Sequence, residues 1–111
     1  MANFFKSETF NLTTTNLTTA LTITTSAIAI VRSVQASHAT ASNVDIDLYL
    51  KKSGGSDVEI GHAVLNKSTE NLAKNVINLE GGDILKLQAD TANEITGQIS
   101  YLLIDRSQEN G

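Results

Sequence analysis

The alternation of apolar and polar residues between Asn43 and Lys51 is the feature that most constrains the fold. In the segment NVDIDLYLK, an aliphatic side chain occupies every second position, and polar residues or a tyrosine fill the positions between. Successive side chains of a β-strand point to opposite faces of a sheet. The segment therefore predicts a strand with one face in the core and the other in water.

Weaker versions of this pattern recur along the chain and are separated by turn sequences such as Gly54-Gly55 and EGGD. We expect strands over 16–24, 27–37, 43–51, 58–65, 70–79, 84–89 and 94–105. The segment 70–79 also fits helical spacing, but its asparagines and its strand neighbours favour a strand. About seven short strands with tight turns predict an all-β fold, an antiparallel β-sandwich or jelly roll, with a flattened barrel as the alternative.

The apolar positions of these strands define the expected core. We expect inward-facing side chains at Val44, Ile46, Leu48, Leu50, Leu85, Leu87, Ile99, Tyr101 and Leu103. In the strand 27–37, one face is expected to carry Ile28, Ile30, Arg32, Val34 and Ala36. Gly97 within the last strand is expected to mark a bulge. The strands 27–37 and 95–104 are apolar on both faces, so the second face needs cover from another sheet or subunit, which favours self-association.

Composition excludes several classes of function. The chain of 111 residues makes one domain, and it has no cysteine for a disulfide or a thiolate metal site. Its net charge of −4, with 8 basic and 12 acidic residues, argues against nucleic-acid binding. No apolar run approaches the roughly 20 residues needed to span a membrane.

The sequence shows no constellation that carries chemistry. His38 and His62 lack the spacing of metal ligands, and we expect them at the surface or at a strand edge. Asp45 and Asp47 lie two residues apart on the wet face of a strand, where both stay solvated. The glycine-rich stretches lack the lysine and helix of a phosphate loop. We therefore predict no catalytic residue, no metal site and no cofactor, which means that the chain is not an enzyme.

All three phenylalanines, Phe4, Phe5 and Phe10, lie in the segment NFFKSETF near the N-terminus. Phe10 could fold over the end of its own sandwich. Phe4 and Phe5 are adjacent, so in an extended chain they point to opposite sides and one domain surface cannot easily bury both. We expect residues 1–11 to form an N-terminal arm in which Phe4, Phe5 and Phe10 form the interface with a partner, residues 12–105 the sandwich, and residues 106–111 a solvated tail.

Two C-terminal stretches, GDILKLQA (82–89) and ISYLLI (99–104), follow a pattern of strand, polar turn and strand. Together with LTTALTIT (17–24) and IAIVRSVQAS (28–37), they resemble small β-sandwich virion proteins of tailed bacteriophages, especially marine and cyanobacterial ones. The resemblance covers about residues 12–105. It departs at the turn TTSA, where a Pro-Gly type turn is usual, and in the unmatched segment NFFKSETF.

The resemblance implies a non-enzymatic structural protein of the virion, assembled in the host cytoplasm. The first expectation is a capsid decoration (cement) protein, a homotrimer that binds the major capsid protein and stabilises the head. The alternative is a tail, neck or fibre-attachment subunit that binds tail or neck proteins. A carbohydrate-binding or adhesin module is more remote, because only Tyr49 and Tyr101 remain to stack on a sugar. Neither nucleic acid nor a membrane is an expected partner.

Overall fold

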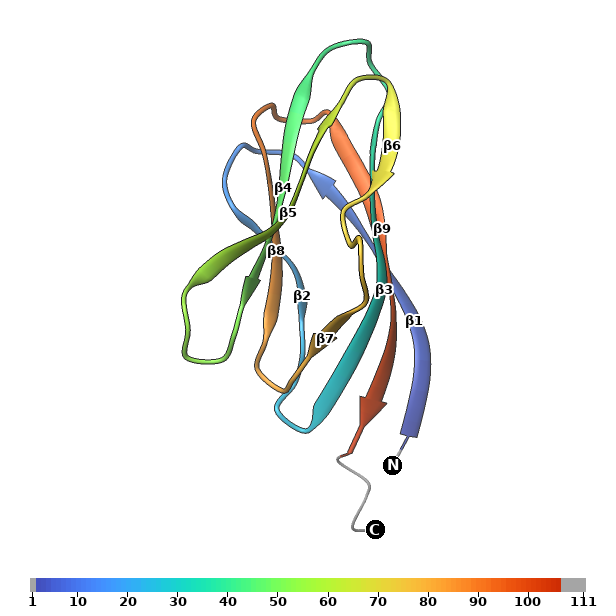
Figure 1. The fold of residues 1–111 in the computed structure, drawn as a ribbon, viewed down its shortest axis with the longest axis vertical. Helices are drawn as coiled ribbons and strands as arrows, with labels where there is room; N and C mark the ends of the chain where they lie inside the picture. Colours follow the sequence, from blue (N-terminus) through green and yellow to red (C-terminus); the bar gives the residue numbers. More distant parts are fainter. Residues whose placement is uncertain (1, 107–111) are drawn as a thin grey trace.

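The computed structural model describes residues 2–106, which form nine antiparallel strands in two packed sheets and no helix (Figure 1). The antiparallel β-sandwich predicted from the sequence is thus confirmed. The strands are β1 (Ala2–Leu12), β2 (Thr18–Thr22), β3 (Ala27–His38), β4 (Val44–Lys51), β5 (Asp57–Leu65), β6 (Ser68–Asn71), β7 (Ile77–Leu79), β8 (Ile84–Ala89) and β9 (Ile95–Asp105). Among the described residues, no helix is long and apolar enough to cross a membrane.

The two sheets differ in size and in the strands they bring together. The five-stranded sheet has the order β1-β9-β3-β6, and β7 also pairs with β3. The four-stranded sheet has the order β2-β8-β4-β5. Strands from both ends of the chain therefore lie side by side in the larger sheet, with β9 between β1 and β3 (Figure 1).

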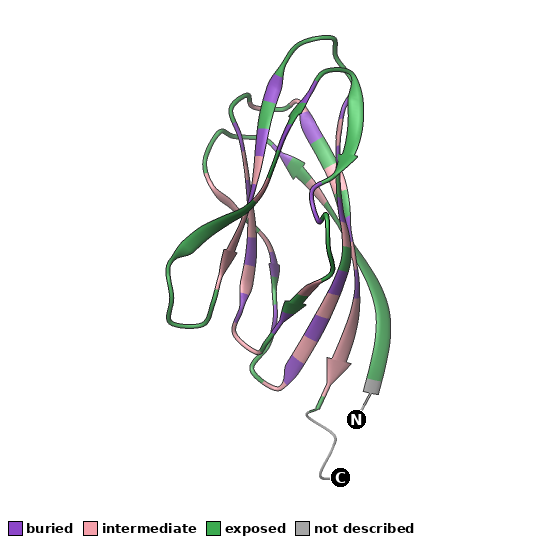
Figure 2. Cartoon of the chain, in the orientation of Figure 1, coloured by how far each residue is buried: buried purple, intermediate pink, exposed green. Residues whose placement is uncertain are grey.

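The core lies between the sheets, where period-two alternation predicted it. Of the nine side chains expected to face inward, seven are buried: Val44, Ile46, Leu48, Leu85, Leu87, Ile99 and Tyr101. Leu50 and Leu103 are partly buried and pack against the same core. Buried and more exposed positions alternate along the central strands (Figure 2). Removal of these aliphatic side chains from water, at roughly 1.5–3 kcal/mol each, stabilises the sandwich.

A bulge in β3 overturns the face predicted for this strand. The register with β9 shifts between Val31 and Ser33, so that Arg32 is an extra residue without a partner. Ala29 and Val31 are buried before the bulge, and Val34 is buried after it. One inserted residue moves every following side chain to the other face. Ile28 and Ile30 consequently point away from the core, contrary to the expectation that they share a face with Val34.

Gly97 is not a bulge, and the prediction that it marks one is wrong. It pairs in regular register with Phe10 of β1 and Ala36 of β3. A Cβ atom at Gly97 would overlap both Cζ of Phe10 and the carbonyl oxygen of Gln35. The glycine is needed because the Phe10 ring and a neighbouring backbone approach it closely.

The N-terminal segment is a strand of the sandwich, which corrects the prediction of a separate arm over residues 1–11. β1 pairs with β9 from Ala2, opposite Asp105, to Leu12, opposite Ile95, without a register shift. The described residues thus give no boundary between residues 11 and 12. Of the predicted solvated tail, Arg106 is exposed, and residues 107–111 lie outside the described residues.

The segment 70–79 contains no helix but is broken into two strands. β6 ends at Asn71 and β7 begins at Ile77. The Asn71 side-chain oxygen accepts hydrogen bonds from the backbone N–H groups of Val34, at 2.9 Å, and Ala73, at 3.0 Å. These bonds satisfy backbone donors where the strand ends, so the preference for strand was right but its continuity was not.

Candidate functional site

A cluster of ionisable side chains lies on the outer face of the four-stranded sheet. Asp47 of β4 pairs directly with His62 of β5, and Nδ1 of His62 lies 2.5 Å from Oδ1 of Asp47. A register shift between Leu48 and Tyr49 brings Glu59 to the same place. One ligand atom from each of Asp47, Glu59 and His62 lies within 4.8 Å of the others. No sequence pattern connects Asp47 with His62, and it is the pairing of β4 with β5 that brings them together.

The Asp47 carboxylate controls the protonation of its two neighbours. Its hydrogen bond raises the pKa of His62, which favours the imidazolium form. A side-chain hydrogen bond with Asp47, followed by repulsion between the two carboxylates, raises the pKa of Glu59. A proton on His62 therefore offsets part of the negative charge that Asp47 and Glu59 bring to the cluster.

Two carboxylates and an imidazole are donors that Zn²⁺ and similar ions accept. Here, however, Nδ1 of His62 and Oδ1 of Asp47 already bond to each other, and half of the His62 side chain is exposed. Metal binding through these same two atoms would have to break that bond, and the ion would be held at an open surface. The geometry is that of a surface ion pair with an added carboxyl group.

Surface hollows near these residues are small. One, lined by Thr15, Asp47, Gln88, Ala89 and Asp90, has a volume of about 140 Å³. Another, beside the break between β6 and β7, has about 170 Å³. Pockets for drug-sized ligands span roughly 300–1,000 Å³. Both hollows suit a few water molecules or an ion better than a cofactor.

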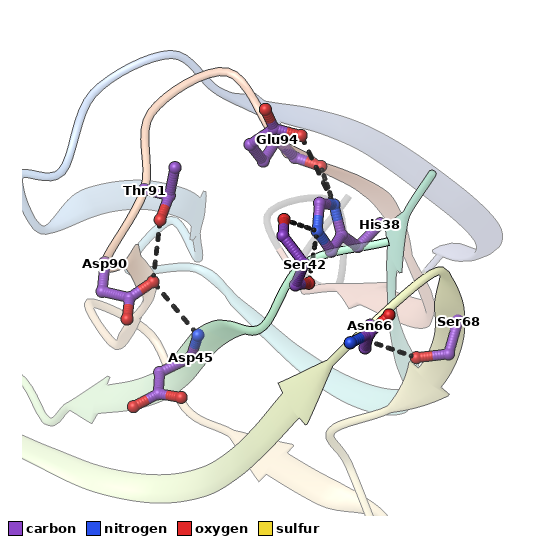
Figure 3. A network of polar contacts seen from close by, with 8 residues as sticks. All are labelled: His38, Ser42, Asp45, Asn66, Ser68, Asp90, Thr91 and Glu94. Atoms are coloured by element: carbon purple, nitrogen blue, oxygen red, sulfur yellow. Dashed lines mark hydrogen bonds and ion pairs between the residues drawn. The ribbon is translucent and has the colours of Figure 1, made fainter. Parts of the chain in front are cut away.

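His38 was expected at the surface or at a strand edge, but it is buried at the end of β3. One ring nitrogen lies 2.9 Å from the carbonyl oxygen of Ser42, and the other 3.2 Å from that of Glu94 (Figure 3). The same region holds Asp90, whose side chain accepts the backbone N–H of Asp45 at 3.1 Å. These contacts fasten loops at one end of the sandwich, so His38 has a structural role.

The tyrosines offer little surface for a sugar. Tyr101 is only 4% exposed, and its hydroxyl donates to Glu8 at 3.4 Å. Tyr49 lies on the wet face of β4, where burial, followed by the charges of Asp47 and Glu59, raises its pKa. Of the two tyrosines, only Tyr49 therefore offers ring surface for the stacking that a carbohydrate-binding module uses.

The outer face of the five-stranded sheet carries a second candidate surface. Ile28 pairs with Ile104, and Ile30 pairs with Leu102, which in turn pairs with Phe5. Paired residues of antiparallel strands point to the same face, so these side chains form one group, which we call the apolar outer face: Phe5, Ile28, Ile30, Leu102 and Ile104. Phe5 is 77% exposed. A second apolar face was expected from the sequence, but Ile28 and Ile30 were expected on the same face of β3 as Val34, which the bulge at Arg32 contradicts.

The three phenylalanines lie as their spacing predicts, on alternating sides of one strand. Phe4 is 45% exposed on the core side, and Phe5 is on the outer side. Phe10 packs partly buried against the core, over Gly97. Phe10 therefore belongs to its own sandwich, whereas the proposed interface role of Phe4 and Phe5 remains a prediction.

The fold defines the chain as an antiparallel β-sandwich of two sheets. No known protein family and no curated protein matches its sequence. Among solved structures, it is similar to a chain of the acid-stable capsid of Helicobacter pylori bacteriophage KHP30, with a TM-score of 0.60 and 11% identity over 96% of this chain and 90% of that one. It is also similar to a chain of Bacillus endospore appendages, which are disulfide-linked pili, with a TM-score of 0.54 and 12% identity over 92% and 84%. At such identities the similarity shows a shared fold.

Proposed function

We propose that this chain is a non-enzymatic structural subunit of a virion, and that it acts as a capsid decoration protein. The observation that carries the proposal is the apolar outer face. Phe5 of this face is exposed and its other four side chains are partly exposed, and large contiguous apolar patches on a soluble protein mark interaction sites. The fold shared with a phage capsid chain is consistent with this role.

The position of the apolar outer face suits docking onto another rigid body. Its five side chains come from β1, β9 and β3, which are hydrogen-bonded neighbours at the centre and edge of one sheet. The backbone beneath them is therefore held by the sheet, and little order has to be gained on binding. Phe5 supplies an exposed aromatic ring, the type of side chain that dominates interface energetics.

Two substitutions test whether this face binds particles. Ile30→Thr and Leu102→Thr together remove apolar area but keep residues that favour strands. We expect the double variant to fold like the wild type but to lose binding to particles in a cosedimentation assay. Gln98→Thr is the matched control, since Gln98 is exposed on the same face of β9 but outside the apolar group. Equal binding by the double variant and the wild type would refute the proposal.

Copy number and position separate the decoration role from the alternative, a tail or neck subunit. The particles should be those produced from the genome that encodes this chain, and the chain is quantified in them by mass spectrometry and located by electron cryomicroscopy. We expect many copies distributed over the head shell. A single ring at the neck or tail would favour the alternative, and absence from purified particles would overturn the virion role.

A further inference from the structure

β1 differs from the other strands at the margins of the two sheets. Proteins protect sheet edges with short strands, bulges and charges, because an unpaired edge can pair with another chain. β2 has 5 residues, β6 has 4 and β7 has 3, and the pairing of β2 with β8 is irregular. β5 is longer, but a register shift interrupts its pairing with β4 and it carries Asp57 and Glu59.

β1 is neither short nor bulged, and its two charges, Lys6 and Glu8, are of opposite sign. It has 11 residues, no proline and no register shift in its pairing with β9. Its side chains from residue 3 to residue 9 are all exposed. Its second edge pairs with no strand of the described chain. Such a long, regular edge can accept a further antiparallel strand.

We propose that this edge binds a second copy of the chain, with the two β1 strands antiparallel about a two-fold axis at Ser7. The occupant is a second copy because two-fold symmetry can place the positive charge of β1 in one copy opposite the negative charge of β1 in the other. The possible registers, compared below, decide where this happens. In a two-fold dimer the same surface of both subunits forms the contact. The inference does not depend on the virion role.

Backbone geometry limits the registers. In a strand, the N–H and C=O groups of alternate residues point to the same edge, so a symmetric pairing must join residues of equal parity. Side chains that share a face then meet: the even-numbered residues on the core side and the odd-numbered residues on the outer side. The two-fold axis must therefore lie where one residue faces its own symmetry mate, and not between two successive residues of a strand.

Charge selects among these registers. With the axis at Lys6, two lysines would face each other, and with the axis at Glu8, two glutamates would do so. With the axis at Ser7, Lys6 of each copy lies opposite Glu8 of the other, which gives two cross-strand ion pairs. Opposite charges across a strand pair stabilise it, and like charges directly opposite destabilise it. Lys6 and Glu8 are the charged residues of β1, so the Ser7 register uses both.

The same register gives each exposed ring of β1 a neighbour. Phe4 lies opposite Phe10 of the second copy on the core side, and Phe5 lies opposite Thr9 on the outer side. Aromatic and β-branched pairs are among the favourable cross-strand contacts. Phe4 and Phe5 point to opposite faces, so one domain surface cannot cover both rings. One added strand lies beside both of them.

A cysteine cross-link tests the register. The chain has no native cysteine. In the Ser7 register, Ser7→Cys faces its own symmetry mate, and the Cα separation of about 4.5–5.5 Å across paired strands permits a disulfide. Thr9→Cys is the matched control on the same face, because it faces Phe5 of the other copy. We expect oxidation to convert most of the Ser7→Cys variant, but little of the Thr9→Cys variant, into covalent dimer.

A charge swap tests the ion pairs by analytical ultracentrifugation of the full chain. We expect Lys6→Glu or Glu8→Lys alone to weaken the dimer about tenfold or more, and the double swap to restore it. Circular dichroism and melting curves check that every variant folds. A wild-type monomer or trimer at micromolar concentration, equal cross-linking at positions 7 and 9, or failure of the double swap to restore the dimer would each overturn the proposal. The particle-binding test at Ile30 and Leu102 alters no residue of β1, so the two proposals fail independently.

Discussion

Replacement of Asp83 by asparagine removes the charge of a buried side chain that joins two turns of the sandwich. Asp83 is 1% exposed and precedes β8. Its carboxylate accepts backbone N–H groups from Glu80, at 2.8 Å, and from Ser53, at 3.1 Å, and Nζ of Lys52 lies 2.5 Å away. The turn between β4 and β5 is thereby tied to the turn between β7 and β8.

The size of the effect follows from these three bonds. A hydrogen bond to a charged group contributes about 1.5–3 kcal/mol, compared with about 0.5–1.5 kcal/mol for a neutral one. Loss of the charge therefore costs roughly 1 kcal/mol for each bond. The amide nitrogen of asparagine also has to face a donor, whereas the lower desolvation cost of an amide offsets part of the loss. We expect Asp83→Asn to lower the free energy of unfolding by about 2–4 kcal/mol.

The pKa of Asp83 gives a second signature. Burial opposes ionisation, but the bonds from Lys52 and from the two backbone groups outweigh it and hold the pKa below its usual value. A carboxyl group with a lowered folded pKa stabilises the protein above its unfolded pKa, and this contribution disappears as the pH falls through the folded pKa. The wild type should therefore lose stability in acid, below about pH 4, and Asp83→Asn should lose less over the same range.

Urea denaturation followed by circular dichroism, at neutral and acidic pH, measures both effects. Glu80→Gln is the matched control: Glu80 is the other carboxylate bonded to Lys52, at 2.9 Å, but its side chain is 77% exposed. Exposed ion pairs contribute about 0–1 kcal/mol, so this variant should remain close to the wild type. An Asp83→Asn variant as stable as the Glu80→Gln variant, or as sensitive to acid as the wild type, would refute the reasoning.

Three further predictions concern other parts of the sandwich. Gly97→Ala should destabilise the protein by about 1–3 kcal/mol or more in urea denaturation, because its Cβ would overlap the backbone of Gln35. NMR titration should give His62 a pKa above its usual value, and any stabilisation from its pairing with Asp47 should be lost as the pH rises through that pKa. EDTA should leave the melting temperature of the protein unchanged. Deletion of residues 2–8 should lower the melting temperature, since it exposes the edge of β9; an unchanged melting curve would show that β1 does not support the fold.

The sequence predicted the parts of the fold that depend on local alternation. Ile46, Leu87 and Ile99 are buried because each lies in a strand whose period of two is uninterrupted. The bulge at Arg32 could not be predicted in this way, because it arises from the pairing of β3 with β9 and leaves no local signal. The position of Glu59 beside Asp47 depends in the same way on a register shift between two strands.

The N-terminal strand was missed because its pattern differs from that of a half-buried strand. β1 lies at a sheet edge with both faces largely exposed, so neither face is uniformly apolar. Lys6 and Glu8 lie on the core side, where alternation alone would require apolar residues. The signal that could have identified the strand is composition, since phenylalanine and threonine favour strands. Aromatic residues near a terminus can thus belong to an edge strand that is paired on one side only.

The proposed dimer contact uses the β1 edge of the five-stranded sheet, and the proposed particle contact uses the outer face of the same sheet, so the two contacts can form together and reinforce each other. In the Ser7 register, even-numbered residues of one β1 meet even-numbered residues of the other, so the core sides of both copies lie on the same side of the joined sheet. The two apolar outer faces then also lie on one side, related by an axis that runs through the sheet. A particle surface with matching two-fold symmetry could bind both faces at once, and the second contact would form at high effective concentration. Two weak contacts, one from each face, would in this way attach the dimer firmly. Loss of the dimer should therefore weaken particle binding even when Ile30 and Leu102 are intact.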